Sequence, residues 1–373
     1  MKSNRKDSII ITCVMLTTIM SLAQNVLIGV FHVPEDVSTT YRVFLSAIPM
    51  LIAICYSLSR GLGKWIVAYS ISILLLLLTC IFFPQNQEYL IHDSLRFTLP
   101  MVLGSCLAIC SIHDFSLIKQ ALYATSWIAV GLAIVYSVSI LEGRFIIENY
   151  NMSFSYGLLL PMMSLYRDKR WYSILGALFI AVLIMAIGSR GALVTFFIYV
   201  FFELLFQRRK GVGLFVILSL SFVLILFIPY LEEIMSAIGV SSRTISLIQS
   251  NDLFYGSHRE DVYSKTIEMI TNAGVLGYGL YGDRIVFNGA YCHNFFLEVL
   301  FDFGIVPGIL ILLLFFSFIL YVFFKSDRNN RIDIIFWIIA AMVPLMISSS
   351  YLIDSSFGIM MGVLVLMKKK LVS

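Results

Sequence analysis

Long apolar runs separated by short polar segments form the main pattern along this chain. Residues 71–80 and 309–316 are apolar with almost no interruption, whereas the strands of membrane barrels alternate apolar and polar residues over about ten positions. A helix needs about 20 mostly apolar residues to cross a bilayer. The pattern therefore predicts an all-α integral membrane protein with about twelve transmembrane helices, at residues 8–31, 41–58, 64–83, 97–112, 117–141, 153–166, 171–187, 191–206, 211–230, 293–324, 332–349 and 351–367.

Composition agrees with a membrane protein. The hydrophobic fraction of the 373 residues is 60%, and the mean hydropathy is +0.92, both far above the values of soluble domains. The N-terminus has a basic start and a weak cleavage-like Ser21-Leu22-Ala23, but apolar sequence continues through Val30, which favours a retained first helix. We predict one polytopic membrane domain over 1–373, with a long outer loop at 231–292.

The distribution of basic residues predicts the orientation of the chain. An even number of spans and basic ends put both termini on the same side. Threading the spans alternately through a bilayer collects most of the 26 Lys and Arg residues in short loops and tails on that side. The positive-inside rule makes this face cytoplasmic. The residues are Lys2, Arg5, Lys6, Arg60, Lys64, Lys119, Arg167, Lys169, Arg170, Arg208, Arg209, Lys210, Lys325, Arg328, Arg331, Lys368, Lys369 and Lys370.

The remaining basic residues fall on the opposite face, against the expected bias. All but one are arginine, whose planar fork binds phosphate through two hydrogen bonds. Their position predicts an anion-handling site on the outer face rather than a bare membrane scaffold. They are Arg42, Arg96, Arg144, Arg190, Arg243, Arg259, Lys265 and Arg284.

The long outer loop contains a recognisable helix. Ser257 and Glu260 fit the capping box at a helix N-terminus, apolar residues follow at near-helical spacing, and Gly274 fits a C-terminal stop. We predict an amphipathic helix at 258–273, lying over the outer face. Further glycines mark an irregular, flexible segment behind it, at positions 277, 279 and 282.

The end of the loop predicts a second short helix. Asn294 is a good N-cap, and the run 295–324 is too long for one untilted span. Glycine and proline at 304–308 suggest a break. Residues 294–303 would then lie at the outer interface, with Glu298 and Asp302 one turn apart and spared the full cost of membrane burial.

Three residues are candidates for chemistry at this face. Arg190, in a hairpin at the outer mouth of the bundle, is either an anion ligand or a snorkelling anchor. Arg259 opens the predicted loop helix, where it and the helix N-terminus would bind phosphate together, unless the neighbouring carboxylates neutralise it. His293 titrates near neutral pH and can act as base or donor, although a lone interfacial histidine is more often structural.

Other polar residues remain open to two interpretations. Arg243 and Arg284 are anion contacts or solvated loop charges. Asp354, in the outer third of the last span, is a functional candidate because intramembrane carboxylates are costly, or it is simply solvated by nearby serines. Five of the six cysteines lie inside spans, and no Cys/His spacing fits zinc. We therefore predict no metal site and no cofactor.

These features together resemble a known family. A twelve-span bundle, Ser-Arg-Gly-Ala at 189–192, a long outer loop before the tenth span, and His-Asn-x-Phe-Leu-Glu…Gly-Ile…Gly at 293–308 are similar to the O-antigen polymerase and ligase superfamily. Its members are bacterial inner-membrane glycosyltransferases that use undecaprenyl-pyrophosphate-linked sugars. The resemblance implies arginines and a histidine around the lipid pyrophosphate. Arg190 and His293 match best, Arg259 matches as the arginine that opens the loop helix, and Arg243 is added as a further contact.

The resemblance implies a metal-independent glycosyltransferase in the bacterial inner membrane, with its active site facing the periplasm. His293 would activate the acceptor hydroxyl, and Glu298 would orient His293 or act as base itself. The expected partners are lipid-linked oligosaccharides, membrane lipid and a chain-length regulator, and no nucleic acid.

Within the superfamily, a polymerase is favoured over a ligase, because the ligase branch often has His-x-His-Asn where this chain has Tyr291-Cys292-His293-Asn294. A lipid-linked-sugar transporter is the alternative from another class. Transporters place charges near the bilayer midplane, and these spans have almost none.

Overall fold

The computed structural model describes residues 2–141, 152–187, 189–206, 259–273 and 275–372. Within these ranges the regular structure is helical. Six helices are long and apolar enough to cross a membrane, and a seventh span is added if α1 (Lys2–Thr18) and α2 (Met20–Phe31), bent by 40° at Ile19, form one crossing. The chain is thus an all-α multi-pass membrane protein. It divides into two compact units, which are described in turn.

The first unit contains the described residues of 1–10, 50–113 and 257–373. It includes the start of α1 and the last part of α3 (Glu35–Leu58). Its other helices are α4 (Leu62–Phe82), the short 3₁₀ turn η1 (Pro84–Asn86), α5 (Gln87–Asp93), the π-helical η2 (Ser94–Leu103), α6 (Gly104–Cys110), α13 (Arg259–Asn272), α14 (Gly282–Val286), α15 (Phe295–Phe303), α16 (Ile305–Lys325), α17 (Arg328–Ile347) and α18 (Ser355–Val372).

Two glycines let α18 pack closely against the η2–α6 segment. A Cβ atom on Gly358 would lie 2.1 Å from the carbonyl oxygen of Val102, and one on Gly362 would lie 2.7 Å from that of Cys106. Small residues spaced four apart are a common means of close helix approach in membranes. The turn that precedes α18 is thereby held beside the end of α17.

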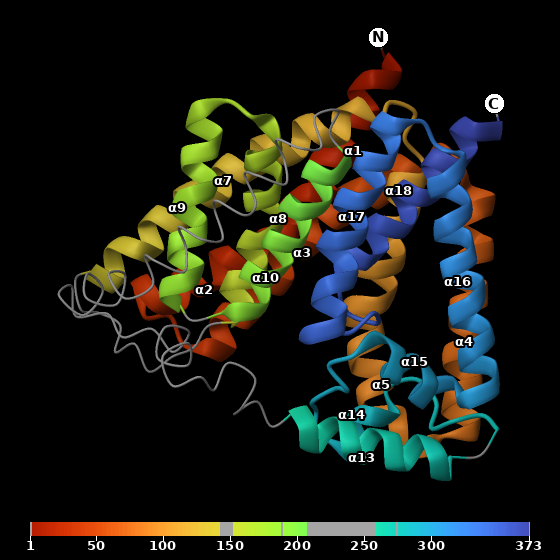
Figure 1. Ribbon diagram of the computed structural model, residues 1–373. Coiled ribbons are helices and arrows are strands. Elements are labelled where there is room, and N and C mark those ends of the chain that lie inside the picture. Colours follow the sequence, from red (N-terminus) through yellow and green to blue (C-terminus); the bar gives the residue numbers. More distant parts are fainter. Residues whose placement is uncertain (1, 142–151, 188, 207–258, 274, 373) are drawn as a thin grey trace. The chain divides into compact units, whose positions relative to one another are not determined.

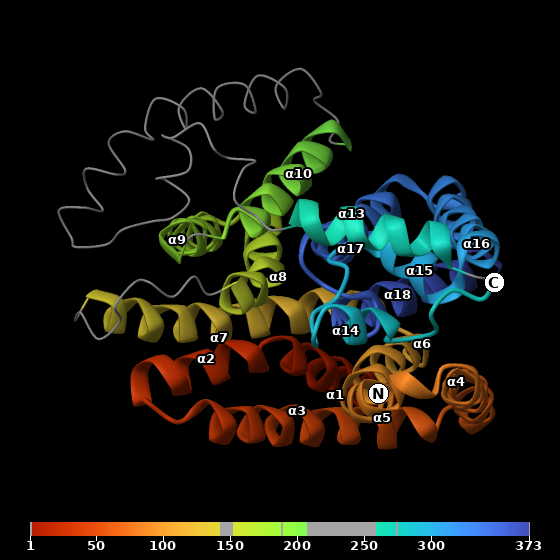
Figure 2. The ribbon, with the colours of Figure 1, turned by 90° about the horizontal axis from the view of Figure 1, so that it is seen from below.

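The outer loop of this unit is built around α13. The predicted helix 258–273 is confirmed as Arg259–Asn272, and it lies across the long axes of α4 and α16 (Figure 1). Viewed from below, α13 extends over α15 (Figure 2). Thr266 and Ile270 form its buried side, whereas Ile267 is exposed.

The predicted break between α15 and α16 is also confirmed. Gly304 has φ +81°, and a Cβ atom there would lie 2.4 Å from the carbonyl oxygen of Val275. The glycine segment behind α13 is irregular, as predicted, and its amides are bonded to the end of α15. Tyr278 N donates to Phe301 O at 2.9 Å, and Gly279 N donates to Asp302 O at 3.0 Å. These bonds satisfy carbonyl groups in the last turn of α15, which have no partner within the helix.

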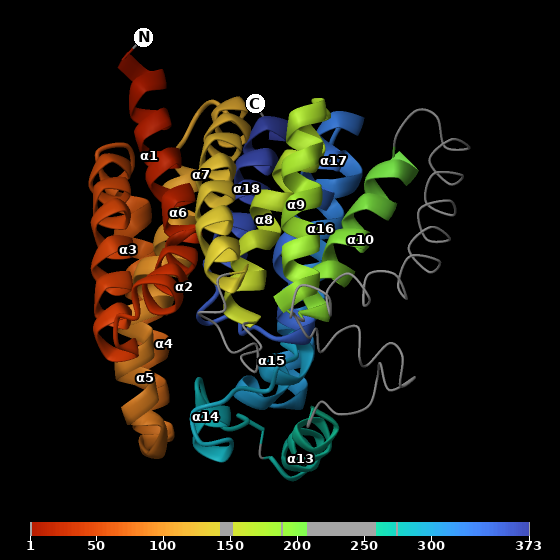
Figure 3. The ribbon, with the colours of Figure 1, turned by 90° about the vertical axis from the view of Figure 1, so that its left-hand side faces the viewer.

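The second unit contains the described residues of 11–49 and 114–256. Helix α8 packs against α7, α9 and α10, and α2 packs against α7 (Figure 3). The predicted spans 171–187 and 191–206 correspond to α9 and α10, while the predicted span 211–230 lies outside the described residues. The bounds in this unit are α7 (Ser116–Leu141), α8 (Met152–Asp168), α9 (Trp171–Ile187) and α10 (Arg190–Phe206).

Candidate functional site

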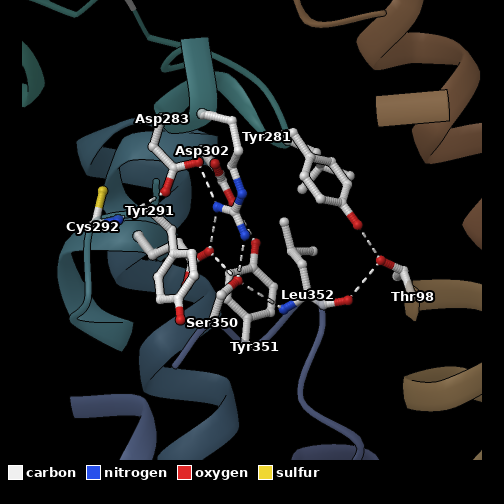
Figure 4. A network of polar contacts seen from close by, with 12 residues as sticks. Thr98, Tyr281, Asp283, Tyr291, Cys292, Asp302, Ser350, Tyr351 and Leu352 are labelled. Carbon is white, nitrogen blue, oxygen red and sulfur yellow. Dashed lines mark hydrogen bonds and ion pairs between the residues drawn. The ribbon is translucent and has the colours of Figure 1, made fainter. Parts of the chain in front are cut away.

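A cluster of polar side chains lies at the outer-loop end of the first unit. Its members come from α14, from the loop that follows it, from α15, and from the turn between α17 and α18. Figure 4 shows Asp283, Asp302, Tyr291, Ser350 and Tyr351 pointing toward one another from these segments. The topology therefore brings three stretches of chain, 281–294, 295–303 and 348–354, to one place.

Arg284 is the centre of the cluster and is 1% exposed. One guanidinium nitrogen, Nη1, donates to Asp283 Oδ1 at 2.5 Å and to Glu298 Oε1 at 2.9 Å. The other, Nη2, donates to Ser350 Oγ at 2.7 Å. Burial lowers the pKa of Arg284, but the Asp283 and Glu298 carboxylates raise it by more, so the side chain is a permanent cation. Arg284, predicted as an anion contact or a solvated charge, is thus buried and bonded to groups of the protein itself.

Glu298 is fully buried and shares its Oε1 atom between Arg284 and the Ser350 hydroxyl. Burial raises its pKa to about 7, because Arg284 is also bonded to Asp283 and does not offset the loss of water. The second oxygen, Oε2, has no hydrogen-bond partner in the described part of the chain. Its full burial places Glu298 to support neighbouring groups rather than to touch a substrate.

Asp302 lies one turn further along α15 and is 1% exposed. It accepts a hydrogen bond from the Tyr351 hydroxyl at 2.6 Å through Oδ2. Burial, with the nearby Asp283 and Glu298 charges, raises its pKa well above the usual range of an aspartate. Asp302 thus belongs to the same buried cluster as Glu298. The sequence predicted the two carboxylates one turn apart but at the outer interface, so their full burial corrects that prediction.

His293 lies beside this cluster and is half-buried. Its backbone has φ +55°, a left-handed conformation that is uncommon outside glycine. Burial and the positive charge of Arg259 lower the pKa of the imidazole to about 4, against smaller opposing effects from Asp283 and the backbone of Ser348. The ring is therefore neutral at physiological pH, which is the state in which it can accept a proton.

Arg259 opens α13, as predicted, and is half-buried. Its charge acts on both His293 and Tyr263, so the structure brings Arg259 and His293 together although they lie 34 positions apart. The predicted capping residue Ser257 lies outside the described residues. The first turn of the helix also carries Glu260 and Asp261.

The other predicted residues lie apart from this cluster or outside the described residues. Arg190 is the first residue of α10 and belongs to the second unit. Arg243 lies outside the described residues. Asp354 lies in the turn before α18, where it accepts hydrogen bonds from Ser349 Oγ and from Ser356 N, each at 2.8 Å. These bonds are those of a helix cap, which agrees with the interpretation that serines solvate Asp354.

Sequence reasoning did not single out two contributors to the cluster. Ser350 joins Arg284 to Glu298, and the tilted ring of Tyr291 lies beside that of His293 with centroids 4.4 Å apart. Ser350 lies 66 positions from Arg284, so no local pattern links them. Tyr291 had a signal, because it occupies the position of the first histidine in the ligase-like motif. Among the described residues, no group of three His, Cys, Asp or Glu could hold a metal ion.

Comparison with protein families gives a match. The model of a family described as O-antigen ligase matches residues 175–313. This match confirms the predicted resemblance to the O-antigen polymerase and ligase superfamily. The matched range contains Arg190, Arg259, Arg284, His293 and Glu298. Comparison with curated proteins and with solved structures gave no match. The match covers a little over a third of the chain and supports a role of the O-antigen polymerase or ligase type.

Proposed function

We propose that this protein is a polymerase that joins undecaprenyl-pyrophosphate-linked oligosaccharide repeat units into O-antigen or capsular polysaccharide. The reaction takes place at the periplasmic face of the bacterial inner membrane, in a twelve-span bundle with both termini in the cytoplasm. The proposal rests chiefly on the pairing of Arg259 with a neutral, half-buried His293 at the end of the outer loop. A cation beside a neutral imidazole suits a reaction that binds an anion and removes a proton.

In the proposed reaction, a hydroxyl oxygen of one lipid-linked repeat unit attacks the anomeric carbon of the growing glycan. The bond between this carbon and the pyrophosphate oxygen breaks as the new glycosidic bond forms. His293 accepts the hydroxyl proton, a role that typically contributes about 10²–10⁴ in rate. The undecaprenyl pyrophosphate leaves as an anion, without a metal ion.

The charge on the leaving pyrophosphate is stabilised by arginines. In this proposal Arg259 and Arg190 bind the phosphate oxygens, with Arg243 as a further contact. Loss of one such donor typically costs about 10²–10³ in rate. Glu298 and Asp302 do not touch the substrate in this scheme, since both are fully buried. Together with Asp283, Arg284 and Ser350 they form the buried cluster that supports His293. A chain-length regulator and membrane lipid are expected partners.

The test is replacement in a strain that lacks the native protein, with glycan chain length read on a gel. We expect His293→Ala, Arg190→Ala and Arg259→Ala to abolish the ladder of polymer bands at normal protein levels. Arg190→Lys should remain strongly impaired, because lysine cannot form the two-pronged contact with phosphate. Lys265→Ala is the matched control for Arg259→Ala, since Lys265 carries an exposed positive charge on the same helix. A wild-type ladder from either His293→Ala or Arg259→Ala would remove that residue from the scheme.

Transfer of finished glycan to lipid A-core by a ligase is the alternative, and the family match fits either reaction. The phenotype of a deletion separates the two. Loss of a polymerase leaves single repeat units on the acceptor, whereas loss of a ligase leaves none.

A further inference from the structure

The backbone around His293 is held in an unusual conformation from both sides. A residue other than glycine with a left-handed backbone costs about 1–2 kcal/mol, so neighbouring contacts must maintain it. The amide of Cys292 donates to Asp283 Oδ2 at 3.0 Å, and the carbonyl of His293 accepts from the Tyr263 hydroxyl at 3.3 Å. Asn294 then caps α15, accepting from Phe296 N at 3.0 Å. These bonds fix the main chain, and the backbone of Ser348 contacts the imidazole itself.

Tyr291 supplies a contact to the ring itself. Its ring centroid lies 4.4 Å from that of His293, with an angle of 56° between the planes. The guanidinium carbon of Arg284 lies 5.2 Å from the centre of the same tyrosine ring. The Tyr291 hydroxyl donates to the carbonyl oxygen of Ser348 at 2.8 Å. The ring of Tyr291 is therefore fixed at its face by a cation and at its edge by a hydrogen bond.

The cation that fixes Tyr291 is immobile in turn. Arg284 is bonded to Asp283, Glu298 and Ser350, and these residues come from three different segments. A guanidinium with this many fixed partners has little freedom to rotate, and cation–π contacts strengthen where water is excluded. A chain of contacts thus runs from the buried cluster through Arg284 and Tyr291 to the imidazole.

We propose that Tyr291 is a positioning residue for His293, which transmits the rigidity of the Arg284 cluster to the imidazole and sets the direction from which it meets the acceptor hydroxyl. This inference rests on the proposed role of His293 as the base. Misplacement of a reacting group by about 1 Å can cost about a hundredfold in rate. A ring that merely filled space would have no such effect on a folded enzyme.

The position of Tyr291 also bears on the ionisation of His293. The tyrosine ring lies against the imidazole at an angle of 56°, and burial is the main cause of the low pKa of His293. The charged groups that act on the imidazole are Arg259 from α13, together with Asp283 and Arg284 from α14. Replacing the tyrosine leaves these charges in place and admits water, so the pKa of His293 should rise toward its usual 6.5.

The experiment measures glycan polymerisation by the purified full-length protein, with undecaprenyl-pyrophosphate-linked repeat units as substrate, over a range of pH. Tyr291→Met fills a similar volume without a flat ring. We expect its kcat to fall about ten- to hundredfold, with a smaller change in KM, and the acidic limb of its pH profile to move upward by at least one pH unit. Tyr291→Phe keeps the ring but loses the bond to Ser348, and its kcat should fall about threefold.

Tyr278→Phe is the matched control. It also loses a hydrogen bond from a tyrosine hydroxyl to a carbonyl, that of Met269 at 3.1 Å, but its ring stacks on Phe301. Its kcat and acidic limb should equal those of the wild type. If Tyr291→Met keeps the wild-type kcat and limb while His293→Ala is inactive, the positioning role is overturned and the function stands. If His293→Ala is active, both fail. If Tyr291→Met does not fold, an unchanged kcat in Tyr291→Phe overturns the positioning role.

Discussion

Arg284 Nη1 lies 2.9 Å from Glu298 Oε1, and both side chains are excluded from solvent. The contact joins α14 to α15. With Asp283 and Ser350 it turns three separate stretches of chain into one rigid wall behind His293. This wall contains the Arg284 cation and the carboxyl groups of Asp283 and Glu298. Its stability therefore depends on whether these carboxyl groups are protonated.

Replacing Arg284 by methionine should destabilise the protein more than any other change in the loop. The Asp283 carboxylate would stay buried without its cation, and breaking a buried pair in this way costs about 3–5 kcal/mol. Arg284→Lys keeps the charge but not the fork, and should be intermediate. Thermal unfolding in detergent measures the effect. Lys265→Met, which removes an exposed cation from α13, should leave the unfolding temperature unchanged. Equal unfolding temperatures for Arg284→Met and Lys265→Met would contradict a structural role for the buried guanidinium.

The rate of glycan transfer should resist acid. A base must be neutral to accept a proton, and the pKa of His293 is lowered to about 4. We expect kcat to hold from neutral pH to about pH 5 and to fall around pH 4, rather than near the 6.5 of an ordinary histidine. In Arg259→Gln the limb should move upward, because the positive charge that disfavours imidazolium is gone. If kcat of the wild type falls at pH 6–7, and if the same fall is seen in Glu298→Gln, His293 does not have the lowered pKa of a buried imidazole.

Glu298 gives the unfolding temperature a dependence on pH. Its pKa in the folded protein is about 7, above the usual 4.5, so the folded state binds a proton more tightly than the unfolded state. Linkage then requires this contribution to stability to be full below about pH 4.5 and to be lost as pH rises through 7. As pH rises over this range, the unfolding temperature of the wild type should therefore fall relative to that of Glu298→Gln. A difference that does not vary with pH would argue against a raised pKa.

Gly304 should not tolerate a side chain. Alanine at φ +81° is strained, and its Cβ atom would lie 2.4 Å from the carbonyl oxygen of Val275. Gly63 in α4 is the control, since no atom lies within 4 Å of its added Cβ. We expect Gly304→Ala to lower the unfolding temperature and the yield of membrane-inserted protein. Gly63→Ala should match the wild type or exceed it, because alanine favours a helix by about 1 kcal/mol over glycine. Equal yields and unfolding temperatures for the two alanine variants would show that the turn can open.

The parts of the fold that were predictable depend on neighbouring residues. The helix at Arg259–Asn272, the Asn294 cap and the break at Gly304 all follow from local patterns of capping and turn residues. The short helix α14 has no such pattern, because its five residues are held by side-chain contacts to distant segments.

The same distinction applies to the site. His293 and Arg259 were identified from their residue types and positions, and the structure brings them together. The burial of Arg284 could not be inferred, because an arginine after an aspartate looks the same in a solvated loop as in a core. Its partners lie 14 and 66 positions away. The roles of His293, Arg259, Arg190 and Arg243 remain predictions.

Ser350 gives the assembly of the protein a definite order. Because the guanidinium of Arg284 is bonded to a hydroxyl that is synthesised 66 residues later, the buried cluster beside His293 is incomplete until residue 350 has left the ribosome. Truncations that remove Ser350 should therefore loosen the support of the His293 imidazole, although that residue lies far upstream in the sequence.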